Sequence, residues 1–72
     1  MVWHYRLRIH KLSGELIETV NFYRDYDYDD EQAYGLLFMR CGHHHSGVLE
    51  VFKQGGMRVF PYFRTYVWKG AD

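Results

Sequence analysis

The sequence contains a single cysteine, Cys41, so no disulfide bond can form within the chain. This excludes the disulfide-stapled scaffold that many small secreted domains use for stability. The first six residues, Met1-Val2-Trp3-His4-Tyr5-Arg6, also lack the apolar stretch of a secretory signal peptide. From these two absences we expect a cytoplasmic protein.

Long apolar runs and an excess of charge of one sign are missing as well. No segment approaches the roughly 20 apolar residues that a helix needs to cross a bilayer, so we expect no membrane association. Nine Lys and Arg residues balance nine Asp and Glu residues, which gives a formal net charge of zero. A chain without net positive charge lacks the overall field that attracts nucleic acid. Any electrostatic function must therefore depend on how the charges are distributed.

Aromatic side chains, in contrast, are abundant and make up 19% of the 72 residues. We expect residues 1–72 to form one domain, because a chain of this length has no room for a second. The core of so short a domain supplies little stability by itself. Each aromatic side chain buries roughly 150–250 Å² when it is enclosed. The aromatic residues therefore either strengthen the core or form a binding surface.

Residues 2–11 alternate in polarity with a period of two, which is typical of a half-buried strand. The residues expected on one face are Trp3, Tyr5, Leu7 and Ile9, and those expected on the other are His4, Arg6, Arg8 and His10.

Ser13-Gly14 indicates a turn, and residues 15–23 have the composition of a return strand. A two-residue turn would place Leu16, Val20 and Phe22 on the face of Leu7 and Ile9. A three-residue loop with a glycine bulge would place Ile17 there instead. We favour the first register, because Val20 and Phe22 are better core residues than their neighbours.

A helix is predicted from about Asp30 to Cys41. Asp29, followed three residues later by Gln32, matches a capping box, and Gly42 suits the left-handed residue that ends many helices. The stripe that can cover a sheet consists of Ala33, Tyr34, Leu37, Phe38 and Cys41.

Three other positions of this helix need a reason. Leu36 and Met39 fall outside the stripe, so either a second molecule covers them or the stripe is wide enough to reach the edge of the sheet. Gly35 lowers the stability of a helix interior, which suggests a close approach at that point.

The C-terminal part of the chain predicts a second hairpin. Residues 48–53 resemble a strand, Gly55-Gly56 indicates a turn, and a further strand begins at Met57. Pro61 cannot donate to a strand ladder, so this strand lies at an edge or bends and continues as a separate short piece. The element order predicts an α+β fold of ββαββ layout, with an antiparallel four-stranded sheet of two hairpins and one helix packed on one face.

Alternation along the last strand separates two sets of side chains. One set is apolar and contains Met57, Val59, Phe63 and Val67. The other mixes arginine with aromatic residues and contains Arg58, Phe60, Tyr62, Arg64, Tyr66 and Trp68.

If the helix covers the apolar set, the arginine and aromatic set shares the opposite face of the sheet with Arg6 and Arg8. Tyr, Trp and Arg dominate the energetics of protein interfaces, so this face predicts protein binding. It also has the composition of a stacking platform for single-stranded nucleic acid. A third interpretation is structural, with some aromatic rings folded back over the sheet beneath arginine side chains.

An acidic segment with interleaved tyrosines precedes the predicted helix. Helix capping accounts for Asp29, but it does not account for Asp25 and Asp27 or for Tyr26 and Tyr28 between them. This segment is either a solvated loop or an element that presents negative charge and aromatic anchors to a basic surface of a partner.

Metal binding and catalysis find little support. His43-His44-His45 lies near Cys41, but adjacent side chains splay apart and no second group of ligands is visible, so we predict no metal site and no cofactor. Cys41 is expected at a helix C-terminus, where a thiolate is not stabilised. No nucleophile with its base, phosphate loop or pair of converging carboxylates can be assembled, so we predict no enzymatic activity.

In size and predicted layout the chain resembles the short ββαββ proteins that bacteria and their phages encode. That group includes small inhibitors of host machinery, among them some anti-CRISPR proteins. The resemblance rests on format, so it carries over no residue role, and it implies an inhibitor of host machinery only at that level.

The sequence thus predicts a non-enzymatic protein-binding module that acts on a partner protein, on a second copy of itself, or on both. The alternative is a single-stranded nucleic-acid binder that uses the same sheet face. The predicted contact residues are Arg6, Arg8, Arg58, Tyr62, Arg64, Tyr66 and Trp68 on the sheet, and Asp25, Tyr26, Asp27, Tyr28 and Asp29 in the acidic segment.

Overall fold

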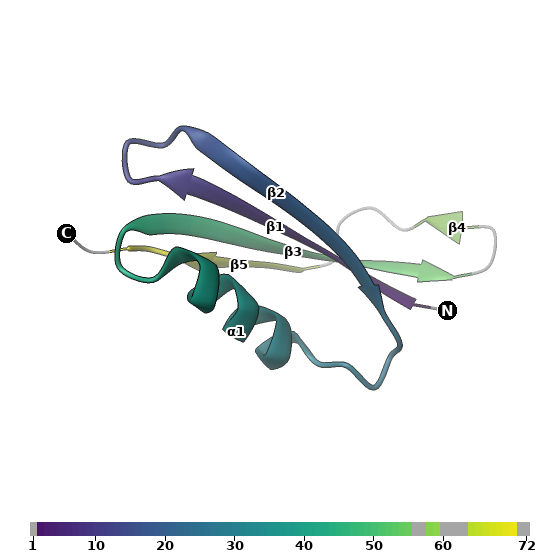
Figure 1. Ribbon diagram of the computed structural model, residues 1–72. Helices are drawn as coiled ribbons and strands as arrows, with labels where there is room; N and C mark the ends of the chain where they lie inside the picture. The colour runs from purple at the N-terminus through teal and green to yellow at the C-terminus, as the bar shows by residue number, and fades with distance from the viewer. Residues whose placement is uncertain (1, 56–57, 60–63, 71–72) are drawn as a thin grey trace.

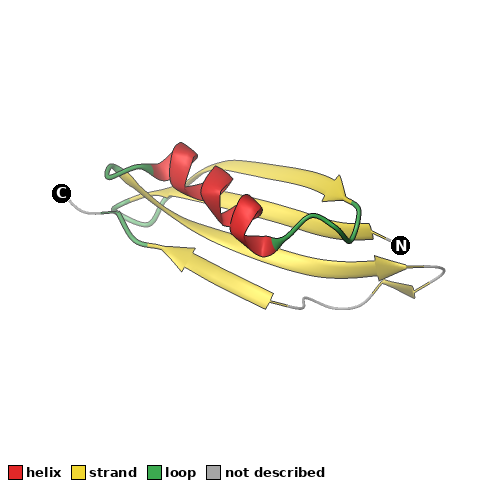
Figure 2. Ribbon diagram, turned by 90° about the horizontal axis from the view of Figure 1, so that it is seen from below, coloured by secondary structure: helices red, strands yellow, loops and turns green. Residues whose placement is uncertain are grey.

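The computed structural model describes residues 2–55, 58–59 and 64–70. Within them the chain forms one antiparallel sheet and one helix, which lies on a single face of the sheet (Figures 1 and 2). The elements are β1 (Val2–Lys11), β2 (Leu16–Arg24), α1 (Asp30–Cys41), β3 (His45–Gly55), β4 (Arg58–Val59) and β5 (Arg64–Trp68). The sheet order is β2-β1-β3-β4, and β5 also pairs with β3. The predicted α+β fold with ββαββ order is confirmed.

Residues 12–15 separate β1 from β2, and backbone bonds enclose residues 12–14 between Lys11 and Glu15, so the predicted two-residue turn is wrong. The N–H of Lys11 donates to the carbonyl of Glu15 at 2.8 Å, and the N–H of Gly14 donates to the carbonyl of Lys11 at 2.8 Å. Gly14 has a φ of 104°, which a residue with a Cβ atom rarely adopts. β1 therefore leaves the hairpin at Lys11, one residue earlier than a turn of Ser13 and Gly14 would require.

A bulge in β2 places Val20 and Phe22 on the predicted face of the sheet, in spite of the different turn. Ile9 lies opposite Glu18, whereas His10 lies opposite Leu16, so Ile17 is the extra residue. Because of this insertion, Val20 pairs with Leu7 on the helix side of the sheet, as predicted. Phe22 pairs with Tyr5 on the same side. The prediction for Leu16 is wrong, because it pairs with His10 on the opposite face.

The ends of α1 are set by local chemistry and match the prediction. The side chain of Asp29 accepts from the N–H of Gln32 at 2.9 Å, and the side chain of Gln32 accepts from the N–H of Asp29 at 3.2 Å. Gly42 has a positive φ of 54° and donates its N–H to the carbonyl of Phe38 at 2.8 Å. The capping box and the terminal glycine are therefore confirmed.

The helix buries a narrower stripe than predicted. Ala33, Leu37 and Cys41 are buried, Tyr34 is half-buried, and Phe38 is exposed. Leu36 packs half-buried against the core, which supports the wide-stripe interpretation for this residue.

Two further positions of the helix point to solvent. Met39 is 78% exposed, so nothing in the described residues covers it. A Cβ atom at Gly35 would meet no atom within 4 Å, so the predicted close approach at this glycine is wrong.

The core is a single apolar layer between the helix and the sheet. The helix packs on β1, β3 and β5, and it contacts β2 through the ion pair of Arg40 with Glu18. The fully buried residues in the described part of the chain are Tyr5, Leu7, Ile9, Ala33, Leu37, Cys41, Leu49 and Val51.

The C-terminal strands share one edge of β3. β4 pairs with Gln54 and Gly55, and β5 pairs with the segment from Gly47 to Val51. The chain therefore continues after β4 as a separate short strand, which is one of the two outcomes predicted from Pro61. Predictions for Met57, Phe60, Pro61, Tyr62 and Phe63 lie outside the described residues.

The one helix of the described residues is too short and too polar to traverse a lipid bilayer.

Candidate functional site: the open face of the sheet

The face assignment of β5 is wrong in the sequence analysis. Three residues of β5 pair with β3: Arg64 lies opposite Val51, Tyr66 opposite Leu49, and Trp68 opposite Gly47. Neighbours across a sheet point to the same side, and these β3 residues lie beneath the helix. Arg64, Tyr66 and Trp68 therefore lie on the helix side and do not share a face with Arg6 and Arg8. The pairing of β4 has the same phase, because Arg58 lies opposite Gly55. The error is therefore the expectation that the apolar set faces the helix, whereas the arginine and aromatic set does.

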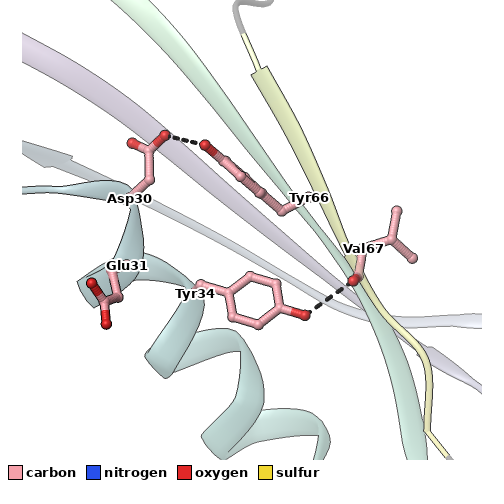
Figure 3. Close-up of a pocket in the computed structure, with 5 residues that line it drawn as sticks. All are labelled: Asp30, Glu31, Tyr34, Tyr66 and Val67. Atoms are coloured by element: carbon pink, nitrogen blue, oxygen red, sulfur yellow. Dashed lines mark hydrogen bonds between the residues drawn. The ribbon is translucent and has the colours of Figure 1, made fainter.

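On the helix side, Arg64 and Tyr66 bind the carboxylate of Asp30 at the start of α1. Figure 3 shows the bond from Tyr66. The Nε atom of Arg64 lies 2.7 Å from Oδ2 of Asp30 and its second terminal nitrogen donates to Oδ1 at 3.2 Å. The hydroxyl of Tyr66 donates to Oδ2 at 2.6 Å. Tyr5 directs its hydroxyl to the same carboxylate from β1, at 3.5 Å. Asp30 thus joins the helix to two strands.

This carboxylate also changes the ionisation of the phenols around it. The hydrogen bond to Asp30 raises the pKa of Tyr66 above its ordinary value. Burial, with the Asp30 charge as the next cause, raises the pKa of Tyr5 to about 12. Both tyrosines therefore remain protonated donors at neutral pH, which keeps the contacts of Asp30 intact.

Trp68 and Tyr34 form further contacts between β5 and the helix, beyond those of Asp30. The indole N–H of Trp68 donates to the carbonyl of Gly42 at 2.7 Å, and its ring meets Phe38 edge-on with centroids 4.8 Å apart. The hydroxyl of Tyr34 donates to the carbonyl of Val67 at 3.1 Å (Figure 3). These contacts attach β5 to the helix, so the helix-side residues have a packing role within the subunit.

An open pocket of about 500 Å³ lies beside these contacts, between the start of α1 and β5. Its lining consists of Asp30, Glu31, Tyr34, Tyr66 and Val67 (Figure 3). Carboxylates beside phenol rings suit a cation in principle. Asp30, however, already accepts hydrogen bonds at both of its oxygens from groups of the same chain.

The opposite face of the sheet is open, because the only helix of the described residues lies on the other side (Figure 2). At its centre are Arg6 and Arg8 of β1 and Glu50 of β3. Arg6 donates two hydrogen bonds to the carboxylate of Glu50, from Nε at 3.0 Å and from a terminal nitrogen at 3.1 Å. The Nε atom of Arg8 lies 3.0 Å from the same carboxylate. The hydrogen bonds from Arg6 lower the pKa of Glu50. Two guanidinium groups thus share one carboxylate, which leaves an excess of positive charge at this point.

A row of rings crosses the open face from β2 to β3. Tyr23, His4 and Phe52 lie on neighbouring strands in register. The ring of His4 stacks on Tyr23 with centroids 4.6 Å apart, and on Phe52 at 5.1 Å. Tyr23 is 53% exposed, so one end of this row is available to another molecule. Arg6 lies over the ring of Phe52 at 5.1 Å and joins the row to the charged centre.

The other end of the open face is apolar. Val67 of β5 pairs with Val48 of β3, and Leu16 of β2 pairs with His10. Val67 is 54% exposed, although the sequence analysis placed it in the apolar set beneath the helix. The open face therefore combines aromatic rings, paired arginines and exposed aliphatic groups.

The acidic segment divides into structural and exposed residues. Asp29 caps the helix, and Tyr28 packs its ring against Tyr5 and Phe22, with centroids 5.4 and 6.2 Å away. Tyr26 packs against Trp3 at 4.8 Å.

The remaining acids, Asp25 and Asp27, lie on an exposed turn in which the N–H of Tyr28 donates to the carbonyl of Asp25 at 3.0 Å. Only these two carboxylates fit the predicted display of charge to a partner.

The other predicted residues give no further site. For Arg58 the backbone of β4 is described but the side chain is not, and Tyr62 lies outside the described residues. His43 and His44 are exposed, and His45 opens β3. Within the residues that the structure describes, no three His, Cys, Asp or Glu side chains cluster as metal ligands. Cys41 is buried, and burial raises the pKa of its thiol.

Sequence reasoning missed four residues that organise the two faces: Asp30, Glu50, Tyr23 and Phe52. Glu50 and Phe52 alternate with the buried Leu49 and Val51, so the period of two in β3 could have placed them opposite the helix. For Asp30 no such signal existed, because its partners depend on which strand lies beside the start of the helix.

Comparison with protein-family models, curated proteins and solved structures finds no match to this chain.

Proposed function

We propose that this protein is a non-enzymatic binding module that docks a partner protein on the open face of its sheet. The observation that carries this proposal is the ring row Tyr23–His4–Phe52, which lies beside the Arg6–Glu50–Arg8 cluster on a face without a covering helix. Arg6 and Arg8 remain contact residues of the proposed interface. Arg64, Tyr66 and Trp68 face the helix and are no longer among them. The contact residues on the open face now include Tyr23, His4 and Phe52.

The composition of this face fits a protein interface. Interface centres are rich in aromatic side chains and arginine, because these residues bury large areas and lose little freedom. Arg6 and Arg8 are already held by Glu50, so the face is ordered before a partner arrives. Because two guanidinium groups share one carboxylate, the partner surface should place an acidic group within an otherwise apolar patch.

A photo-crosslinking experiment tests this proposal. A photoreactive phenylalanine analogue replaces Thr65, which is exposed on the open face opposite Glu50, and in a matched control it replaces Met39 on the outer side of the helix. We expect a discrete adduct with another protein from position 65 and none from position 39. The substitutions Tyr23→Ser and Arg8→Gln should each reduce this adduct, since both remove contacts from the open face.

Equal adducts from both positions, or an adduct indifferent to Tyr23→Ser and Arg8→Gln, would contradict docking on the open face. An adduct of twice the mass of the chain would identify a second copy as the occupant.

A second candidate function is binding of single-stranded nucleic acid on the same face. The specific observation in its favour is that His4 and Phe52 lie on the adjacent central strands, where bases could stack beside Arg8. The zero net charge and the nearby Glu50 oppose phosphate binding. Salt-dependent binding of a labelled oligonucleotide that Arg8→Gln weakens would favour this candidate.

The predicted place of action is the cytoplasm, and its support is the single unpaired cysteine, Cys41. An inhibitory role on host machinery stays a prediction, and its basis is the size and ββαββ layout of the chain. Asp25 and Asp27 are the residues that would present negative charge in such a role, because both are exposed.

A further inference from the structure

The outer edge of β2 is the longest unprotected strand edge in the described part of the chain. β2 spans Leu16–Arg24 and pairs only with β1, so the N–H and C=O groups of alternate residues point away from the sheet. Figure 1 shows this strand at the border of the sheet, on the side away from β5. The backbone of the helix lies away from this strand, and the side chain of Arg40 reaches it at Glu18.

Edges of this kind usually carry features that prevent pairing with another chain, such as proline, lysine or a charge at the middle of the strand. β2 contains neither proline nor lysine, and its charged residues, Glu18 and Arg24, lie near its two ends. Its central residues, 19–23, are Thr, Val, Asn, Phe and Tyr, most of which favour strands. The one irregularity, the bulge at Ile17, lies near the hairpin loop.

We propose that β2 pairs antiparallel with β2 of a second copy of this chain, about a two-fold axis at Asn21. In this register Glu18 lies opposite Arg24 of the other copy, and Arg24 lies opposite Glu18. Val20 lies opposite Phe22, on the helix side of the sheet, and Thr19 lies opposite Tyr23 on the open face.

Charge and packing select this register. Residues that face each other across a strand pair point to the same side, so the axis must pass through a single residue. An axis at Val20 would place Glu18 opposite Phe22, and an axis at Phe22 would place Val20 opposite Arg24. Only the axis at Asn21 pairs opposite charges with each other and apolar side chains with each other, and both kinds of pair stabilise a sheet.

The side chains of β2 are free enough to make these pairs. Val20 and Phe22 are only half-buried, because the helix does not cover their strand. Glu18 is bound by Arg40 at 3.0 Å, but both side chains are about half exposed, and the second oxygen of the carboxylate can accept another donor. Arg24 lies over the rings of Phe22 and Tyr28, at 4.9 and 5.5 Å, and its guanidinium remains on the surface.

The dimer would join the two sheets into one continuous sheet, with the open faces on the same side. A single strand pair is a small interface, so we expect a dimer that dissociates in the micromolar range. The inference does not depend on the proposed function, because the strand pair forms through the backbone edge of β2. Tyr23 is the residue of the ring row that also lies on this strand.

Charge reversal and charge exchange test the register. Analytical ultracentrifugation of the full chain over micromolar to millimolar concentrations should show a monomer–dimer equilibrium. Glu18→Arg would place two arginines opposite each other, and Arg24→Glu would place two glutamates opposite each other, so each should weaken the dimer by roughly tenfold or more. The double substitution Glu18→Arg with Arg24→Glu restores opposite charges and should recover the dimer.

Disulfide crosslinking at the two-fold axis is an independent test of the register. In the proposed register the two Asn21 residues face each other, with Cα atoms about 4.5–5.5 Å apart, which suits a disulfide. Asn21→Cys should therefore crosslink with oxidised glutathione, which accepts the two electrons and two protons of the thiol pair. Thr19→Cys is the matched control, since the two copies of residue 19 would lie about 14 Å apart along the strands.

A monomer at every concentration would overturn the proposal. It would also be overturned by a dimer that the single charge reversals leave unchanged, or by equal crosslinking through positions 19 and 21. Circular dichroism of each variant confirms that a lost dimer is not a lost fold.

Discussion

The carboxylate of Asp30 receives donors from three residues that lie far apart in the sequence: Tyr5, Arg64 and Tyr66. None of these partners is close enough in the chain for a local motif to predict the contact. A charged acceptor of this kind forms stronger hydrogen bonds than a neutral one, so Asp30 contributes to the docking of β5 as well as to the start of the helix. The ionisation of its phenol partners offers a direct measurement of this network.

Alkaline titration tests the environment of Tyr5. A tyrosine in the unfolded chain ionises near pH 10, whereas burial raises the pKa of Tyr5 in the folded protein to about 12. The stabilisation is therefore fully present below pH 10 and is lost as the pH rises from 10 to 12. Denaturant unfolding should show the free energy of unfolding falling by up to about 3 kcal/mol over this interval.

Tyr5→Phe is the control for this titration, because it keeps the buried ring and removes the ionisable hydroxyl. Its free energy of unfolding should fall less over the same interval. The same loss in both proteins would contradict the assignment to Tyr5 and would point to the other tyrosines, Tyr66 among them.

At the scale of single elements, helix α1 was the most predictable part of the chain. Its start depends on Asp29 and Gln32 and its end on Gly42, all of which act through bonds to neighbouring residues. Strand β1 was equally predictable from its alternation. The face of β5 was not, because an apolar set and an aromatic set can each pack against a helix, and only the pairing with β3 decides which side Tyr66 faces. The strand edge of β2 likewise requires the sheet order.

Two glycines show how differently the same residue type acts in two elements. A Cβ atom at Gly47 of β3 would lie 2.6 Å from Cδ1 of Leu37 and 2.7 Å from Sγ of Cys41, so this glycine permits the helix to approach the sheet. Gly47→Ala should lower the free energy of unfolding by roughly 1–3 kcal/mol through overpacking. Urea unfolding followed by circular dichroism measures this loss.

Gly35→Ala is the matched control, because a Cβ atom there meets no atom within 4 Å. Since alanine favours helix more than glycine does, this substitution should raise the free energy of unfolding by about 0.5–1 kcal/mol. Equal effects at both positions would contradict the close approach at Gly47.

The whole molecule is an elongated slab, with extents of 43 × 21 × 15 Å, and its stability depends on one apolar layer. The sequence predicted this layer well, because both the alternation of β1 and the stripe of α1 identify buried positions. It could not predict that the aromatic residues divide between the two faces. Trp68 and Tyr66 pack on the helix side, whereas Tyr23 and Phe52 lie on the open face.

Truncation of the central helix residue tests how much of the free energy of unfolding depends on this apolar layer. Leu37 is completely buried, and Leu37→Ala should cost about 2–5 kcal/mol. A domain of this size has a total stability of only about 3–5 kcal/mol, so much of the variant should be unfolded at room temperature. Met39→Ala, at an exposed position of the same helix, should leave the free energy of unfolding nearly unchanged. A fully folded Leu37→Ala variant in circular dichroism would contradict a core of one layer.

The pairing of β1 with β3 has a consequence for biosynthesis. Residue 2 lies opposite residue 54, and residue 11 lies opposite residue 45, so the central pair of the sheet joins segments separated by most of the chain. On a ribosome, the N-terminal hairpin leaves the exit tunnel long before β3 has been translated. One border of β1 must therefore wait in solution, unpaired, until residues 45–54 have emerged, and the sheet can close only after that point.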